Sequence, residues 1–145
     1  MSDTAAQAWF IAGAGVIIAA GALHMWMALV DAVRPSYFVP KDRSLRPAME
    51  SVQMCFGGTA APSMWRVWRG IHVTHSLGLL AFGLLCVVIA TYDFGLVTSI
   101  DAIRPLEIAV SAAYLAISLR FFFYGPVIIT ATATACFVIA TALSA

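Results

Sequence analysis

The amino-acid sequence predicts an all-α fold of the membrane class, a single domain over residues 1–145 built as a four-transmembrane-helix bundle. Two observations predict it. The composition is 62% hydrophobic and only 10% charged, whereas soluble domains carry about 25% charged residues. Several stretches are also long enough and apolar enough to cross a hydrocarbon core of about 30 Å. A soluble domain and a disordered chain are therefore excluded, and a net charge of +1 gives no indication of a nucleic-acid partner.

Four apolar stretches account for the predicted helices in order along the chain. The first contains His24 as its sole ionisable residue, and the second contains only His72 and His75. The stretch after residue 105 is long enough to cross twice, and Gly125 followed by Pro126 is typical of one helix ending and the next beginning. We therefore predict helices near 8–30, 70–91, 105–122 and 126–144.

The basic residues predict the orientation of these helices, because positively charged segments remain in the cytoplasm. With four spans, the 31–69 connection and the turn after the third helix share one side of the membrane. That side carries seven basic residues, and the opposite side carries one, Arg104. We expect a multi-pass protein of the bacterial cytoplasmic (inner) membrane with both termini outside the cytoplasm. The seven basic residues are Arg34, Lys41, Arg43, Arg46, Arg66, Arg69 and Arg120.

The 31–69 cytoplasmic connection is the one sizeable polar segment, and part of it has a helical pattern. Apolar residues from Leu45 to Val52 recur on one helix face, and Ser44 stands where a helix cap is expected. The pattern predicts a short interfacial helix at 45–54. A plain connecting loop is an equally good interpretation of this segment. Residues typical of a membrane interface follow it: Trp65, Arg66, Trp68 and Arg69.

Three histidines and a serine form a candidate polar or ligand site. His24 and His75 lie at similar depths in antiparallel helices, and His72 and Ser76 lie next to His75 along the second helix. Intramembrane ionisable residues are costly and usually face the bundle interior or water. Three interpretations stay open: haem ligation, acid–base or proton-relay chemistry on a lipid-soluble substrate, and plain hydrogen bonding across helices. We favour the last.

A polar stripe runs along the third predicted helix. Glu107, Ser111, Tyr114 and Ser118 recur at helical spacing, and Arg104 stands three residues before Glu107, where it can form an ion pair. Such stripes usually join helices. The alternative is a polar interior cavity with Glu107 at its outer end and the candidate histidines at its inner end. The fourth predicted helix also carries hydroxyl groups, at Thr130, Thr134 and Thr141.

Four short motifs resemble a family of small bacterial four-helix integral membrane proteins. The clearest are Trp65-Arg-Val-Trp-Arg-Gly70 and His75-Ser-Leu-Gly78; Gly21-Ala-Leu-His24 and Phe38-x-Pro40-x-Asp42 also fit. The match covers about the first ninety residues, and the last two helices match only in hydrophobicity. The resemblance implies the four-helix topology and the importance of His24 and His75, but it names no reaction. It also implies a more polar residue such as asparagine near His72.

The sequence favours binding over catalysis. It contains no zinc-ligand spacing, phosphate-binding loop or paired cysteines, so no metal site is predicted. We expect a non-catalytic accessory subunit of a membrane complex or a small binding module. Its expected partners are the lipid bilayer and either other membrane subunits or a second copy of the chain. The alternative is a membrane enzyme or redox protein that uses His24 and His75 on a lipophilic substrate, quinone or haem.

Overall fold

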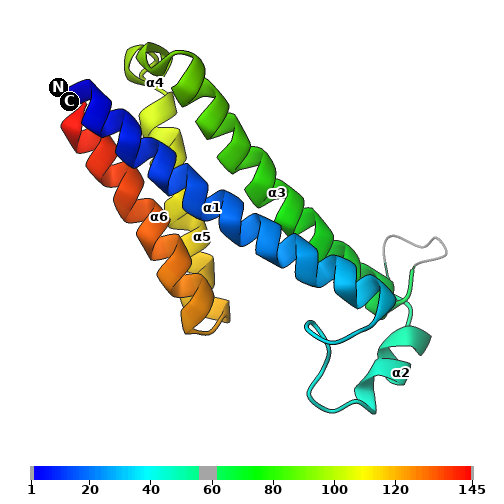
Figure 1. Cartoon of the computed structure of the whole chain (residues 1–145). Helices are drawn as coiled ribbons and strands as arrows, with labels where there is room; N and C mark the ends of the chain where they lie inside the picture. The colour runs from blue at the N-terminus through cyan, green and yellow to red at the C-terminus, as the bar shows by residue number, and fades with distance from the viewer. Residues whose placement is uncertain (1, 56–61, 145) are drawn as a thin grey trace. The chain divides into compact units, whose positions relative to one another are not determined.

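The computed structural model describes residues 2–55 and 62–144, and their regular structure is helical apart from one isolated β-bridge between Gln53 and Ser63 (Figure 1). Three of the helices, α1, α3 and α6, are long and apolar enough to cross a membrane. The helices in chain order are α1 (Ser2–Val33), α2 (Leu45–Ser51), α3 (Met64–Tyr92), α4 (Phe94–Ser99), α5 (Ile103–Phe121) and α6 (Tyr124–Leu143).

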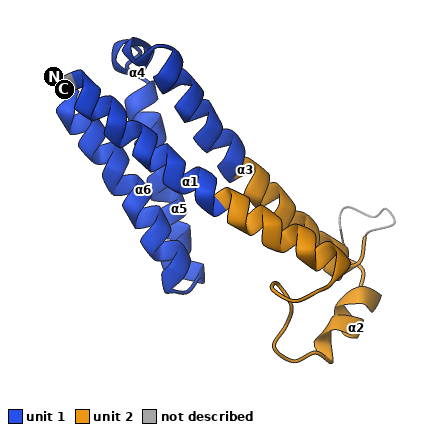
Figure 2. Ribbon diagram, in the orientation of Figure 1, with its two compact units in different colours: residues 1–20, 79–145 blue, residues 21–78 orange. Residues whose placement is uncertain are grey.

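The chain divides into two compact units (Figure 2). Unit 1 comprises residues 1–20 and 79–145, and unit 2 comprises residues 21–78. Helices α1 and α3 each contribute one segment to each unit. Within unit 1, the beginning of α1 and the end of α6 lie close together (Figure 1).

Aromatic rings and small residues form the core of unit 1. The Phe10 ring packs edge-on against the rings of Phe137 and Phe94, with distances between ring centroids of 5.4 and 5.9 Å. Glycine permits close helix contacts: a Cβ at Gly83 would come within 2.6 Å of Ile18 Cγ1, and one at Gly13 within 3.0 Å of Cys136 Cβ. Small residues at such contacts let helix backbones approach closely, which is the usual packing of membrane helices.

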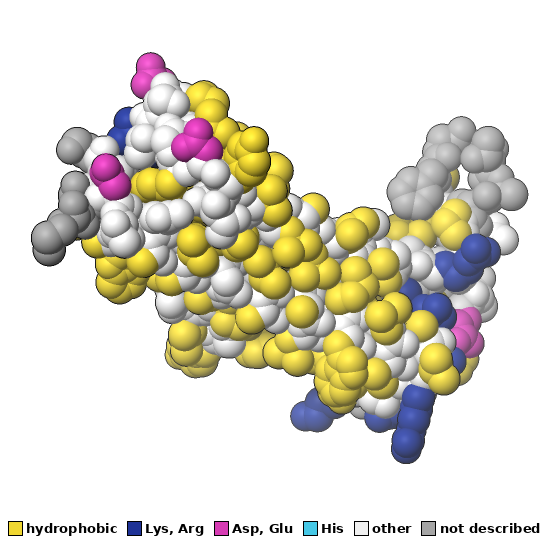
Figure 3. Space-filling model, turned by 45° about the horizontal axis from the view of Figure 1, so that its top comes forward, with side chains coloured by type: hydrophobic (Ala, Val, Ile, Leu, Met, Phe, Trp, Pro, Cys, Tyr) yellow, Lys and Arg dark blue, Asp and Glu magenta, His cyan; other side chains and the backbone are white. Residues whose placement is uncertain are grey.

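Hydrophobic side chains cover much of the surface, as the face in Figure 3 shows. Along α3, for example, Leu77, Leu84, Leu85 and Val88 are all exposed. A water-soluble domain rarely presents large contiguous apolar surfaces, whereas lipid-facing helices do. Exposed side chains of this kind therefore agree with the three apolar helices long enough to span a membrane.

Helix α5 is not one of those three helices. It has 19 residues and carries Arg104, Glu107 and Arg120, so it is more charged than the other long helices. It packs against α6 in unit 1. The prediction that it is a fourth span, over 105–122, stays a prediction.

The helix ends differ in several places from the ranges expected from the sequence. Helix α1 begins at Ser2 and α3 at Met64, so both are longer than expected at their N-terminal ends. The short helix α2 ends at Ser51 instead of 54, where the chain becomes extended at Val52. Helix α4 was not expected; its cap is the Asp93 carboxylate, which accepts a 2.9 Å hydrogen bond from the Gly95 amide.

The expected cap of α2 is wrong. The Ser44 side chain makes no capping hydrogen bond to the helix. Its hydroxyl and its amide instead donate to Asp42 Oδ1 at 2.7 and 2.9 Å. The Ser44 backbone is helical, at φ −67° and ψ −23°, whereas a capping serine is usually extended, and Pro47 at the third helix position has no amide to donate to a cap.

Candidate functional site

Unit 2 brings together three histidines and two aromatic residues, His24, Phe38, Trp68, His72 and His75, here named the histidine–aromatic cluster. The Nε2 atom of His24 and the Nδ1 atom of His72 are hydrogen-bonded at 3.1 Å. The Phe38 ring stacks face-to-face on the rings of His72 and His24, with distances between ring centroids of 3.9 and 4.6 Å. The His75 ring meets His24 edge-on at 5.1 Å, and Trp68 meets His72 edge-on at 4.8 Å.

Three segments position this cluster. His24 comes from α1, and His72 and His75 lie three residues apart on one face of α3. Phe38 comes from the segment between α1 and α2. The Trp68 indole donates a 2.8 Å hydrogen bond to the Phe38 carbonyl oxygen, so α3 holds this segment as well as the histidines.

Asp31 orders the segment that carries Phe38. Its carboxylate accepts three backbone hydrogen bonds, from Ser36 and Tyr37 at 2.6 and 2.8 Å and from Phe38 at 2.6 Å. The side chain is 2% exposed, and it is also near enough to interact electrostatically with His72. A carboxylate in the last turn of a helix opposes the helix dipole, so a compensating contact is expected there. That local conflict is the sequence signal that could have identified Asp31.

The histidine pair shares one proton. One ring must donate and the other accept in the hydrogen bond between His24 and His72, which requires complementary tautomers when both rings are neutral. The second nitrogen of His72, Nε2, is buried and makes no hydrogen bond within residues 2–55 and 62–144. The cluster therefore combines a hydrogen-bonded pair of nitrogens with one buried nitrogen, Nε2 of His72, that makes no hydrogen bond among the described residues.

The spacing of the rings does not suit a haem iron between them. The two axial nitrogens on opposite sides of one iron would be roughly 4 Å apart, since metal–nitrogen bonds are about 2 Å long, whereas Nε2 of His24 and Nδ1 of His72 are 3.1 Å apart. A porphyrin plane between two axial imidazoles needs still more room. In the part of the chain that the structure describes, no group of three or more His, Cys, Asp or Glu side chains is arranged to hold a metal ion.

The Ser76 side chain bonds to the backbone of its own helix and is not part of the histidine–aromatic cluster. Its hydroxyl is buried and donates a 2.8 Å hydrogen bond to the His72 carbonyl oxygen, one turn earlier on α3. Hydroxyl groups in membrane helices commonly bond in this way to their own helix. Of the residues in the expected site, the structure thus brings His24, His72 and His75 together.

The interfacial residues divide between buried and exposed positions. Trp65 is 4% exposed and lies under the Arg46 guanidinium, whose carbon is 5.4 Å from the ring centroid. Its ring is therefore occupied within unit 2, unlike the lipid-facing ring that the sequence indicates. Trp68 and Arg66 are exposed, and Arg69 is half-buried.

A second candidate site, in unit 1, consists of a buried carboxylate. Glu107 is 3% exposed, and neither of its oxygens has a hydrogen-bond partner among the described residues. The expected ion pair with Arg104 is wrong. The Arg104 guanidinium instead donates to two backbone carbonyl oxygens, of Ser144 at 3.2 Å and of Thr98 at 3.3 Å. These carbonyls lie near helix ends, where they lack partners within their own helix.

The remaining hydroxyls of the polar stripe bond mostly to their own helices. Ser111 donates to Ile108 on α5, and on α6 Thr130 donates to Pro126 and Thr134 to Thr130. Ser118 is buried and Tyr114 is half-buried. The hydroxyl bonds of Ser111, Thr130 and Thr134 therefore stay within their own helices, whereas the sequence predicts a stripe that joins helices. The polar cavity expected between Glu107 and the histidines involves both units and stays a prediction.

No match is found. Comparisons with protein-family models, with curated proteins and with solved structures all end without one. The likeness of the Trp65–Gly70 and His75–Gly78 motifs to small bacterial membrane proteins therefore stays a prediction.

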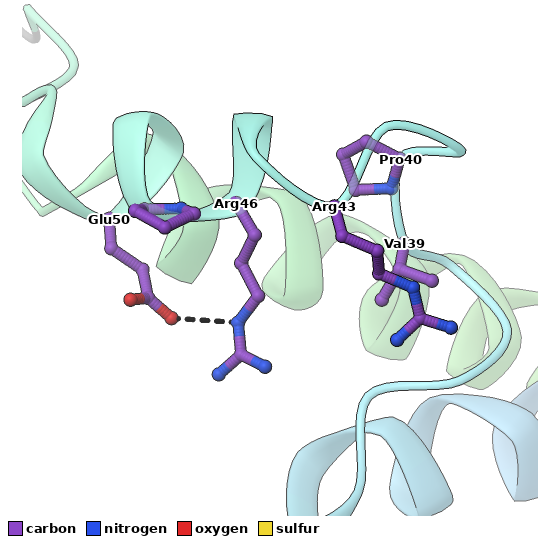
Figure 4. Close-up of a pocket in the computed structure, with 6 residues that line it drawn as sticks. Val39, Pro40, Arg43, Arg46 and Glu50 are labelled. Atoms are coloured by element: carbon purple, nitrogen blue, oxygen red, sulfur yellow. Dashed lines mark hydrogen bonds and ion pairs between the residues drawn. The ribbon is translucent and has the colours of Figure 1, made fainter.

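Unit 2 also contains a cavity of about 280 Å³ beside α2 (Figure 4). Two arginines and one glutamate provide its polar lining, and the Nε of Arg46 is bound to the Glu50 carboxylate at 2.9 Å. No residue of the expected ligand site lines it. The lining residues are Val39, Pro40, Arg43, Arg46, Pro47 and Glu50.

Proposed function

We propose that this chain is a multi-pass integral membrane protein that acts as a non-catalytic binding module or accessory subunit. One observation carries the proposal: the side chains best suited to chemistry are engaged with one another. His24 and His72 are joined by a hydrogen bond, and Phe38 covers the faces of both rings. A general acid or base needs a nitrogen within reach of its substrate, and this pairing uses one nitrogen of each ring.

The proposal places α5 in the membrane beside α6 as a fourth span. Four spans return the chain to its starting side, in agreement with the proximity of the beginning of α1 and the end of α6 within unit 1 (Figure 1). Unit 2 carries six basic residues, and positively charged connections remain in the cytoplasm. The termini would then face away from the cytoplasm of a bacterial inner membrane. Cysteine accessibility from each side of sealed vesicles tests this orientation.

Purification in mild detergent tests the binding role. We expect one membrane protein, or a second copy of this chain, to remain at a constant molar ratio through two purification steps and to crosslink to the chain in intact membranes. His75→Ala should change no reaction, and Thr74→Ala is the matched control because Thr74 is the neighbouring exposed residue that bonds to its own helix. A defined turnover that is lost in His75→Ala and kept in Thr74→Ala would contradict the proposal.

A second candidate function rests on the buried Nε2 of His72. If His24 donates to Nδ1 of His72, then Nε2 carries a proton that could be donated to a carbonyl oxygen of a lipophilic substrate such as a quinone. This would make the chain a membrane enzyme or redox protein. A quinone suits the cluster better than haem, because the hydrogen-bonded rings leave no room for a porphyrin between them.

Absorption and extraction experiments separate these ligands. A Soret band in the purified protein would indicate haem. A quinone extracted with organic solvent at about one molecule per chain would support the second function if His72→Phe lost it and Thr74→Ala kept it. Phenylalanine preserves stacking on Phe38 but removes both ring nitrogens, so the comparison isolates the hydrogen bond. Equal retention by both variants would exclude the histidine as the ligand.

A further inference from the structure

The cavity beside α2 presents two guanidinium groups to one space. Arg43 and Arg46 both line it, and in Figure 4 their side chains extend to the same side of the chain. Arg46 uses its Nε for Glu50, so its terminal amino groups remain available, and Arg43 makes no ion pair among the described residues. Guanidinium groups match the geometry of phosphate oxygens and bind them through paired hydrogen bonds.

Neighbouring contacts hold Arg46 in place before any ligand arrives. Glu50 binds its Nε at 2.9 Å, and the buried Trp65 ring lies 5.4 Å below its guanidinium carbon. A side chain held on two sides loses less conformational entropy on binding than a free one. The lining is net positive, with two arginines and one glutamate.

The surroundings of the cavity suit a ligand at a membrane surface. Its other walls are apolar, formed by Val39, Pro40 and Pro47. Leu45 and Val52, at the two ends of α2, are 51% and 52% exposed. The cavity lies on the connection between α1 and α3, two helices long enough to span a membrane. Its volume of about 280 Å³ is just below the range for drug-sized ligands and so suits a small head group.

Charge around the cavity favours an anionic lipid over a neutral one. Residues 34–69 contain six basic and two acidic side chains. Clusters of four to eight basic residues beside a membrane helix attract anionic lipids. We propose that the cavity binds the phosphate of an anionic phospholipid head group through Arg43 and Arg46. This rests on the membrane placement proposed above, which alkaline-carbonate extraction of the membranes tests separately.

Lipid retention tests the site on the full chain. The protein is reconstituted in nanodiscs of phosphatidylcholine with phosphatidylglycerol, extracted in mild detergent, and analysed for bound lipid by native mass spectrometry. The wild type should retain phosphatidylglycerol in preference to phosphatidylcholine, and Arg43→Ala should reduce that preference about fivefold, the effect expected for one arginine near the surface. Arg43→Lys should restore part of it, because the charge returns without the paired donors.

Two further variants keep the test decisive. Lys41→Ala removes an exposed positive charge two residues away that does not line the cavity, so it should leave the preference nearly unchanged. Glu50→Gln removes the one negative charge from the lining and should raise the preference, which no folding defect would do. An equal loss in Lys41→Ala and Arg43→Ala would overturn the proposal in favour of general surface charge. Displacement of the lipid by inorganic phosphate, at a concentration where sodium chloride of equal ionic strength displaces none, would also overturn it, because free phosphate would then be the favoured ligand.

Discussion

The two units of this molecule are stabilised in different ways. Unit 1 buries aromatic and aliphatic side chains, with Phe10 and Phe137 fully covered and small residues at the helix contacts. In the described residues of unit 2, only Ala28 and Trp65 are buried hydrophobic residues, and polar contacts made by Asp31, Trp68 and the histidine pair order the chain. Dispersion and close packing therefore stabilise unit 1, whereas hydrogen bonds stabilise unit 2, which contains both proposed sites.

Truncation of a buried ring tests the packing of unit 1 and should change the free energy of unfolding the most. Phe137→Ala should lower the free energy of unfolding by about 3–5 kcal/mol, because it removes a fully buried ring that contacts Phe10 and Phe82. Thermal unfolding in detergent, followed by circular dichroism, measures the loss. Val138→Ala is the matched control, since its side chain is 46% exposed. Equal effects of the two substitutions would show that packing of this ring does not stabilise unit 1.

The next largest effect tests the polar order of unit 2. Asp31→Ala removes an acceptor of three backbone hydrogen bonds and should cost about 2–4 kcal/mol of local stability, since bonds to charged groups are the stronger ones. Hydrogen–deuterium exchange of the amides of residues 36–38 should become faster, while exchange in α6 stays as it was. Asp42→Ala, which removes an exposed carboxylate, provides the comparison. Unchanged exchange at residues 36–38 would disprove the role given to Asp31.

Replacement of the buried Glu107 carboxylate tests whether unit 1 is stabilised by apolar packing alone. Glu107→Met should raise the free energy of unfolding by about 1–3 kcal/mol, because it replaces two buried oxygens that lack hydrogen-bond partners with an apolar chain of similar length. The melting temperature in detergent measures the change, with Glu50→Met as the exposed counterpart. A lower melting temperature for Glu107→Met would mean that Glu107 is held by a partner and that unit 1 also depends on a polar contact.

The smallest effect concerns the turn before α2. Two hydrogen bonds from Ser44 hold the pKa of the Asp42 carboxyl below its ordinary value of 3.8. A lowered folded-state pKa stabilises the turn fully above the unfolded value, and the stabilisation disappears as the pH falls through the folded value. The turn should therefore be insensitive to pH near neutrality and loosen only below about pH 4. An NMR titration of the Ser44 amide measures it, and a change centred above that pH would be inconsistent with these bonds.

The sequence alone predicts the apolar helices and the candidate histidines, but not how the rings meet. Apolar stretches identify α1, α3 and α6 because membrane-spanning length depends on composition. The hydrogen bond joins His24 to His72, and the sequence does not show this pairing because spacing along α3 does not determine which ring faces α1. Helix rotation depends on packing against neighbours, and composition does not contain that information.

Contacts to the backbone explain the other differences. Asp31 binds three amides and Arg104 binds two carbonyl oxygens, and any residue type can provide these groups. Matching opposite charges in the sequence therefore pairs Arg104 with Glu107, which lies one turn away. It gives no indication that Asp31 binds backbone amides. The Arg104 contact to Ser144 joins residues 40 positions apart, a separation that only the packing of α5 against α6 makes short.

The segment after α1 forms an anion-binding site that is filled by a carboxylate of the same chain, that of Asp31. The amides of residues 36–38 converge on Asp31 from only five to seven positions away, as an amide-lined host does on a carboxylate guest. Because the Asp31 carboxylate is covalently linked to these amides through a few residues of backbone, its effective concentration is high and no free anion has to bind. Phe38 is thereby held over the histidine rings whatever anions the surrounding solution contains.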